Sequence, residues 1–192
     1  MNPLIASGTL IIHVLFDAYI VILLLRFMLQ KLRASWHNPL SQFVIKVTEK
    51  PLKLMRKIAP GFKGFDFSIL IFAFLLQAIE VMLLWHLQFG ATTNVAGTLI
   101  VALGELLSKF VYIYIYSIII NAIASWIPSM QTHPLLHIVF LITDPVLSLA
   151  RRFIPLIGGI DLSPIAVLLI FSLINTLIVA PISMIGTRII LG

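Results

Sequence analysis

The sequence reads NPLSQFVIKVTEKPLKLMRKIAPGFKGFD over residues 38–66 and HPLLHIVFLITDPVLSLARRFIPLIGGID over residues 133–161. A shift of 95 positions aligns the two stretches without a gap, and ten of the 29 aligned residues are identical. Both copies lie between long apolar runs. Similarity at a fixed spacing is the sequence signature of a duplicated architecture. We therefore expect two related halves, residues 1–96 and 97–192, each with one copy of this motif.

The composition is that of a membrane protein. Hydrophobic residues make up 60% of the chain and charged residues 10%, whereas a soluble domain has roughly 45–50% and about 25%. A bilayer-spanning helix needs about 20 apolar residues, and we place four spans at about 4–26, 67–89, 98–127 and 164–186. The predicted fold is an all-α membrane protein with four transmembrane helices, arranged as two tandem helix–loop–helix repeats. The absence of cysteine excludes disulfides, thiolate metal sites and cysteine nucleophiles.

The basic residues are concentrated in and beside the first motif. Nine of the thirteen Lys and Arg residues lie between Arg26 and Lys63, so the net charge of +6 indicates membrane orientation rather than a nucleic-acid partner. The positive-inside rule predicts that both motif loops face the cytoplasm and both termini the periplasm of a bacterial inner membrane. Apolar and basic residues of the first motif alternate at helical spacing. This predicts an amphipathic helix on anionic lipids, bent or interrupted at Pro51.

The two motifs resemble those of the YggT family of small bacterial membrane proteins. The resemblance is carried by NPLSQFVIKVT, by the basic pairs Arg56-Lys57 and Arg151-Arg152, by a following proline, and by the endings GFDFS and GGIDLSP. It covers both halves, and the first copy departs from the pattern at Lys63, which replaces a small residue. The resemblance implies no enzymatic activity. It associates bacterial members with osmotic or envelope-stress tolerance, and plastid relatives with cytochrome b6 haem maturation.

Four charged residues lie inside the apolar runs. Charges at membrane depth cost several kcal/mol, so each requires a partner, a wet cavity or a function. Glu105 and Lys109 are four residues apart and can pair on one helix face, whereas Asp17 and Glu80 have no evident local partner. These four residues form a candidate intramembrane cation or proton site. The alternative is that the carboxylates are protonated or hydrogen-bonded packing residues.

The histidines give no comparable pattern. His13 and His86 are expected near the outer ends of adjacent spans, where two imidazoles could ligate haem or a metal. However, no CxxCH motif is present, and His133 and His137 lack the glutamate of an HExxH motif. Interfacial histidines are the simpler interpretation, and we expect no metal or cofactor site.

The basic residues of the motifs are candidate contacts for lipid phosphates or an acidic partner surface, although membrane anchoring explains their charge equally well. We expect Asp66 and Asp161, where a loop enters a span, to cap the exposed amides of the helix start. The candidate lipid or partner contacts are Lys53, Arg56, Lys57, Arg151 and Arg152.

No catalytic triad, phosphate-binding glycine loop or pair of catalytic carboxylates can be recognised, so an enzyme is not predicted. The first hypothesis is a non-catalytic inner-membrane protein that supports osmotic or envelope-stress tolerance through lipid or protein contacts. A second is a small cation or proton transporter or channel component that uses the intramembrane acids. A third is an assembly factor for a membrane complex. The expected partners are anionic lipids, with a membrane protein or a second copy of the chain as further possibilities, and no nucleic acid.

Overall fold

The computed structural model describes residues 3–58, 66–127, 132–154, 159 and 161–192. Four of its helices are long and apolar enough to cross a membrane, which confirms the predicted all-α fold and its four spans. The fourth, Ser163–Leu191, is one continuous helix with an internal π-helical turn. The elements are α1 (Pro3–Lys31), α2 (Pro39–Ile58), α3 (Phe67–Phe89), α4 (Val95–Ser125), α5 (Pro134–Ala150), α6 (Ser163–Ile174), η2 (Asn175–Val179) and α7 (Ala180–Leu191).

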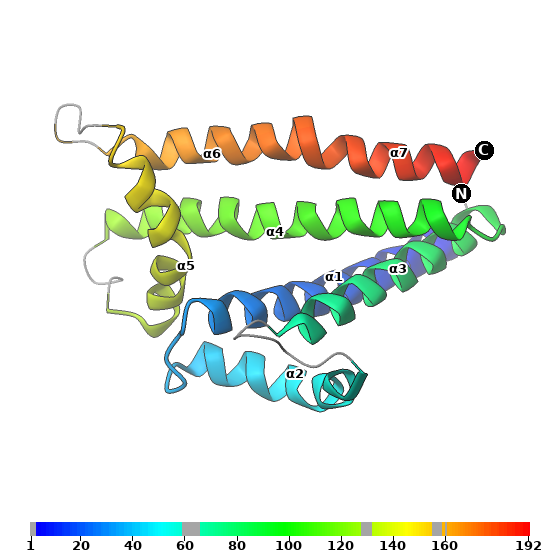
Figure 1. Cartoon of the computed structure of the whole chain (residues 1–192), viewed down its shortest axis with the longest axis horizontal. Helices are drawn as coiled ribbons and strands as arrows, with labels where there is room; N and C mark the ends of the chain where they lie inside the picture. Colours follow the sequence, from blue (N-terminus) through cyan, green and yellow to red (C-terminus); the bar gives the residue numbers. More distant parts are fainter. Residues whose placement is uncertain (1–2, 59–65, 128–131, 155–158, 160) are drawn as a thin grey trace.

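The spans form two pairs (Figure 1). Helix α1 packs against α3, and α4 packs against α6 and α7. Both termini and the α3–α4 connection lie at one end of the bundle, and the α1–α2 connection and α5 lie at the other (Figure 1). Helix α2 runs alongside α1, and α5 crosses the end of α4. The two motif helices therefore begin at the same end of the molecule, as an even number of crossings between them requires.

The first and third spans differ from their predicted limits, as does the fourth. We expected the first to end near Arg26, but α1 continues to Lys31, because the buried guanidinium of Arg26 finds partners on α2 in place of water. The third span begins before the predicted residue 98. The Asn94 side chain accepts hydrogen bonds from two backbone amides and so starts α4 at Val95. The third span ends at Ser125 rather than at the predicted residue 127.

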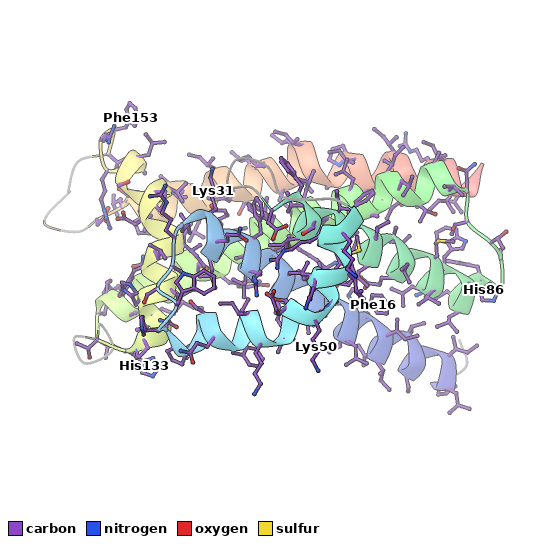
Figure 2. The ribbon with its side chains drawn as sticks, turned by 60° about the horizontal axis from the view of Figure 1, so that its bottom comes forward. Phe16, Lys31, Lys50, His86, His133 and Phe153 are labelled. Atoms are coloured by element: carbon purple, nitrogen blue, oxygen red, sulfur yellow. The ribbon has the colours of Figure 1, made fainter. Side chains whose placement is uncertain are left out.

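Helix α2 has the amphipathic character that the sequence predicts. Val44, Thr48 and Leu52 are buried, and the helix packs on α1 and α3. Pro51 lies inside it, and Figure 2 shows the helix changing direction next to Lys50. The predicted bend is therefore confirmed, as expected where proline removes a backbone hydrogen bond and its ring presses on the preceding turn.

The fourth span extends past the predicted residue 186 to Leu191. Arg188 lies in its last turn, where a cation interacts favourably with the helix dipole. The π-helical turn Asn175–Val179 comes just before Pro181. Proline has no amide hydrogen to donate to the preceding turn, and a local widening of the helix is one way to accommodate this loss.

Close contact between α4 and α7 requires glycine. A Cβ atom on Gly186 would lie 2.6 Å from the backbone nitrogen of Val101 and 2.8 Å from the carbonyl oxygen of Gly97. Small residues that let two backbones approach are the usual basis of helix packing in membranes. This contact fixes the second pair of spans, just as the apolar core around Ile20, Leu24 and Ile69 fixes the first.

Candidate functional site

A buried acid lies where α1 and α3 meet. The Glu80 side chain is 1% exposed, and both of its carboxylate oxygens have partners. Oε1 is 2.7 Å from Nδ1 of His13 on α1, and Oε2 accepts a hydrogen bond of 3.0 Å from Nε2 of Gln77, one turn earlier on α3. A buried polar group that is fully hydrogen-bonded avoids most of the cost of leaving water.

Asp17 extends this arrangement to a third helix. It follows His13 by one turn of α1, with its Oδ2 atom 3.4 Å from His13 Nε2. Lys109 on α4 places Nζ 2.8 Å from Asp17 Oδ1, so the ion pair joins the two halves of the chain. The expectation that Asp17 and Glu80 lack a local partner is therefore wrong, because His13 lies one turn before Asp17 and Gln77 one turn before Glu80. The four-residue spacing of His13 and Asp17 was the sequence signal that could have shown this.

Glu105 is the candidate that the structure leaves apart. It forms no hydrogen bond or ion pair with any residue that the structure describes, and the pair suggested within α4 does not form because Lys109 contacts Asp17 instead. Three of the four predicted residues, Asp17, Glu80 and Lys109, thus lie around His13. We call His13, Asp17, Glu80 and Lys109 the acidic crossing.

The acidic crossing has side-chain atoms that can ligate a small cation or share a proton. One ligand atom each from His13, Asp17 and Glu80 lies within 4.8 Å of the others. Carboxylate oxygens and an imidazole nitrogen are ordinary ligands of divalent cations. Asp17 and Glu80 were expected in a cation or proton site, but not together with His13, because the three residues come from two helices. The acidic crossing can therefore exchange a proton among two carboxylates and an imidazole, or hold a cation between them.

The other histidines do not join this group. The alternative in which His13 and His86 together ligate haem or a metal finds no support, since His13 contacts Glu80 and Asp17, and His86 lies at the far end of α3 (Figure 2). His133 caps α5, where its Nδ1 accepts a hydrogen bond of 3.3 Å from the amide of Leu135. Its role is local to the helix start.

The second half repeats the polar contacts of the first at the same spacing of 95 residues. Ser108 Oγ donates to Asn175 Oδ1 (3.0 Å), and Asn175 Nδ2 lies 3.3 Å from the hydroxyl of Tyr112. These three residues replace His13, Glu80 and Asp17 by neutral groups. The duplicated pairs are His13–Glu80 with Ser108–Asn175, Arg26–Thr48 with Asn121–Thr143, and Arg56–Asp66 with Arg151–Asp161.

The first motif helix is tied to the bundle by Glu49. Its two oxygens accept hydrogen bonds from Arg26 (2.7 Å) and Arg56 (3.0 Å). The hydrogen bond from Arg26 is the main cause that holds the pKa of Glu49 below its usual value, and the charges of Arg26 and Arg56 add to it. Arg56 also binds Asp66 at 2.8 Å. Asp66 therefore does not cap α3 as expected, because its carboxylate binds Arg56 and the hydroxyl of Ser68 instead.

The corresponding acid of the second half does cap a helix. Asp161 Oδ1 accepts a hydrogen bond of 2.9 Å from the amide of Ser163, and Oδ2 accepts one of 2.8 Å from Arg151. Burial acts to raise the pKa of Asp161, but the hydrogen bonds from Ser163 and Arg151 outweigh burial and leave it below its usual value. The capping prediction is confirmed for this residue.

The remaining predicted contacts lie on the surface. Lys53 and Lys57 are exposed on α2, and Arg152 is exposed just after α5. Lys46 and Lys50 share the outer face of α2 with them and are also exposed. None of the four lysines has an ion-pair partner in the described part of the chain.

Comparison with known proteins agrees with the duplication. The family model described as CCB3/YggT matches the chain twice, over residues 5–87 and 100–182. The chain belongs to the CCB3/YggT family. The two matches are themselves 95 residues apart, so each half of this YggT-family chain is one copy of the family unit. The family predicted from the motifs is confirmed.

Bacterial relatives cover most of the chain. An uncharacterised protein of Pseudomonas aeruginosa is 36% identical over 170 residues, which is 88% of this chain and 86% of the relative. The uncharacterised protein YggT of Escherichia coli K12 is 31% identical over 87% of this chain and 86% of its own length. No solved structure matches the chain. These relatives place the chain in a family without a stated activity, and no catalytic family is indicated.

Proposed function

We propose that this YggT-family protein is a small, non-catalytic membrane component that binds and transfers a proton or a small cation at the acidic crossing. The observation that carries the proposal is Glu80, a carboxylate 1% exposed inside a membrane-spanning helix. An ionisable residue at membrane depth is by default a functional-site hypothesis, because its burial is costly and needs a partner.

The neighbours of Glu80 support exchange rather than permanent neutralisation. His13 and Asp17 are 51% and 34% exposed, so the acidic crossing extends from a buried carboxylate to a partly open pair. The ammonium group of Lys109 lies 2.8 Å from Asp17, so it can neutralise this carboxylate when a proton or cation leaves. Such a chain of carboxylate, imidazole and lysine is typical of proton and cation pathways in membranes.

The test is ion flux in liposomes that contain the purified protein. We expect proton or monovalent cation flux down an imposed gradient, and its loss in Glu80→Gln. Glu105→Gln is the matched control, because it makes the same change in a membrane-spanning acid that has no partner among the described residues. Equal flux in wild type and Glu80→Gln, or equal loss in both variants, would rule out the acidic crossing as the pathway.

The exposed lysines of α2 favour a second candidate function. In this proposal the chain supports osmotic or envelope-stress tolerance in a bacterial inner membrane, with both motif loops in the cytoplasm. It would act through contacts of the basic residues with anionic lipids or with an acidic partner. Each lysine near an anionic leaflet contributes about 1 kcal/mol of attraction.

The two functions can be separated in cells. Reversal of Lys53 and Lys57 to glutamate should reduce growth of a deletion strain under osmotic stress if contacts carry the function, while Glu80→Gln should not. The opposite result would favour ion transfer. Replacement of Lys46 and Lys50 in the same helix by glutamate shows whether growth depends on particular lysines or only on the total positive charge of this face.

A further inference from the structure

A pocket of about 830 Å³ lies between the end of α1, the connection that follows it, and α2. Three arginines line it, namely Arg26, Arg33 and Arg56, and Glu49 is the acid among its lining residues. The charged lining therefore carries an excess of positive charge. This pocket is separate from the acidic crossing, whose residues do not line it.

The three arginines differ in how they are held. Arg26 is 7% exposed and binds Thr48 and Glu49, and Arg56 binds Glu49 and Asp66. Both guanidinium groups are thus fixed beside the pocket by the protein itself. Arg33 is exposed and has no ion pair with a described residue, so its charge is available to a ligand.

The backbone at Arg33 is unusual. Its φ angle is +52°, the only positive value found for a residue other than glycine in the described ranges. A residue other than glycine in the left-handed region is uncommon. Here it ends α1, with the amide of Ala34 donating to the carbonyl of Leu29, and it turns the chain so that Arg33 lines the pocket.

An unpaired hydroxyl provides a second, independent observation. Ser41 is 4% exposed and lines the pocket, and its Oγ atom has no hydrogen-bond partner among the described residues. Most buried hydroxyl groups in proteins have a partner. A phosphate oxygen in the pocket would supply the missing acceptor.

Apolar side chains also line the pocket. Leu29, Trp36, Val44 and Ile45 line the same pocket, and Trp36 is 69% exposed. Tryptophan is enriched at the level of lipid headgroups, where its ring contacts both apolar and polar groups. A ligand with a phosphate group next to a hydrocarbon part would satisfy both kinds of lining.

We propose that this pocket binds the phosphate group of an anionic lipid, held by Arg33 with Ser41 and the fixed pair Arg26 and Arg56, with the start of an acyl chain against Trp36. Arginine suits this role because its planar group donates two hydrogen bonds to one phosphate. The proposal does not depend on ion transfer, because none of its residues contacts Glu80.

The test measures lipid binding by the purified full-length protein in a neutral detergent. Short-chain phosphatidylglycerol, phosphatidylcholine with the same acyl chains, and inorganic phosphate are titrated separately by calorimetry. We expect phosphatidylglycerol to bind more tightly than phosphatidylcholine. Arg33→Gln should weaken its binding about tenfold, since a hydrogen bond from a charged donor is lost, and Ser41→Ala should weaken it by a smaller factor.

Arg188→Gln is the matched control, because it removes the same charge from an exposed arginine of α7, outside the pocket and at the opposite end of the bundle. We expect it to change binding less than about twofold. Equal losses in Arg33→Gln and Arg188→Gln would overturn the proposal in favour of general surface attraction. Equal binding of the two lipids would also overturn it, and binding of inorganic phosphate as tight as that of phosphatidylglycerol would overturn the lipid assignment in favour of free phosphate.

Discussion

At the scale of single residues, three of the four charged residues within the spans, Asp17, Glu80 and Lys109, have partners on another helix, and Glu105 has none among the described residues. The sequence located the acids correctly, because a carboxylate in an apolar run is conspicuous. It could not assign their partners, because these spans are apolar on all sides and their rotation about the helix axis leaves no periodic signal. Glu80 therefore meets His13 rather than His86, and Lys109 meets Asp17 rather than Glu105.

The ion pair between Asp17 and Lys109 should stabilise the contact between the two halves. Replacing Lys109 by methionine leaves Asp17 with His13 alone. We expect a loss of roughly 1–3 kcal/mol in the free energy of unfolding, less than the 3–5 kcal/mol of a fully buried pair, because Asp17 is partly exposed. The double variant Asp17→Asn with Lys109→Met should recover most of the loss. Reversible unfolding in mixed micelles measures this cycle, and strictly additive losses would show that the pair does not couple.

The lowered pKa of Glu49 predicts how stability depends on pH. The folded state holds the pKa of this carboxyl below its ordinary value of 4.5, so the unfolded state takes up the proton first as the pH falls. The stabilisation by Glu49 is complete above the ordinary pKa and is lost as the pH falls through the folded value. Melting temperatures recorded between pH 7 and the acid limit should therefore fall less steeply in Glu49→Gln than in wild type. Parallel curves would contradict this role.

At the scale of elements, the existence of the helices and the bend at Pro51 were predictable, whereas the π-helical turn and the extension of α1 were not. Runs of apolar residues fixed the four spans to within a few residues, and Pro51 fixed the bend of α2. The π-helical turn Asn175–Val179 leaves no such signal, because one extra residue in a turn does not alter an all-apolar pattern. The extension of α1 beyond Arg26 was also hidden, since it depends on acceptors that α2 supplies from the next element.

The contact between α4 and α7 should tolerate no side chain at Gly186. A Cβ atom there would meet backbone atoms of α4, which cannot rotate away. We expect Gly186→Ala to lower the free energy of unfolding by about 1–3 kcal/mol, the usual cost of overpacking. Gly8→Ala is the matched control, because a Cβ atom at Gly8 in α1 meets nothing within 4 Å. It should be neutral or stabilise the helix by up to about 1 kcal/mol. Similar losses in both variants would point to a general intolerance of added methyl groups.

At the scale of the whole molecule, the duplication accounts for both the similarity and the difference between the halves. Both copies run in the same direction through the bundle, so the pseudosymmetry axis is parallel to the membrane normal, as in other parallel repeats. The threonine of each motif bonds the residue that precedes it by 22 positions, Arg26 in the first half and Asn121 in the second. The duplication of the fold could be predicted from the sequence. The replacement of two contacts of the first half that involve ionisable residues by neutral contacts in the second half became clear only when the structure showed that these residues occupy equivalent places.

The topology can be tested directly, because the chain contains no cysteine and single cysteines can be introduced at exposed positions. Lys53 on α2 and Arg152 after α5 belong to the two motifs, and Thr92 lies in the α3–α4 connection at the end that holds both termini. The concentration of basic residues in the first motif predicts that this motif faces the cytoplasm. An impermeant maleimide added to intact spheroplasts should therefore label Thr92→Cys, and should label Lys53→Cys and Arg152→Cys only after lysis. Reversal of all three results would invert the orientation and leave the fold intact. Labelling of Lys53→Cys and Arg152→Cys from opposite sides would contradict the two parallel repeats, because an even number of crossings must separate their motifs.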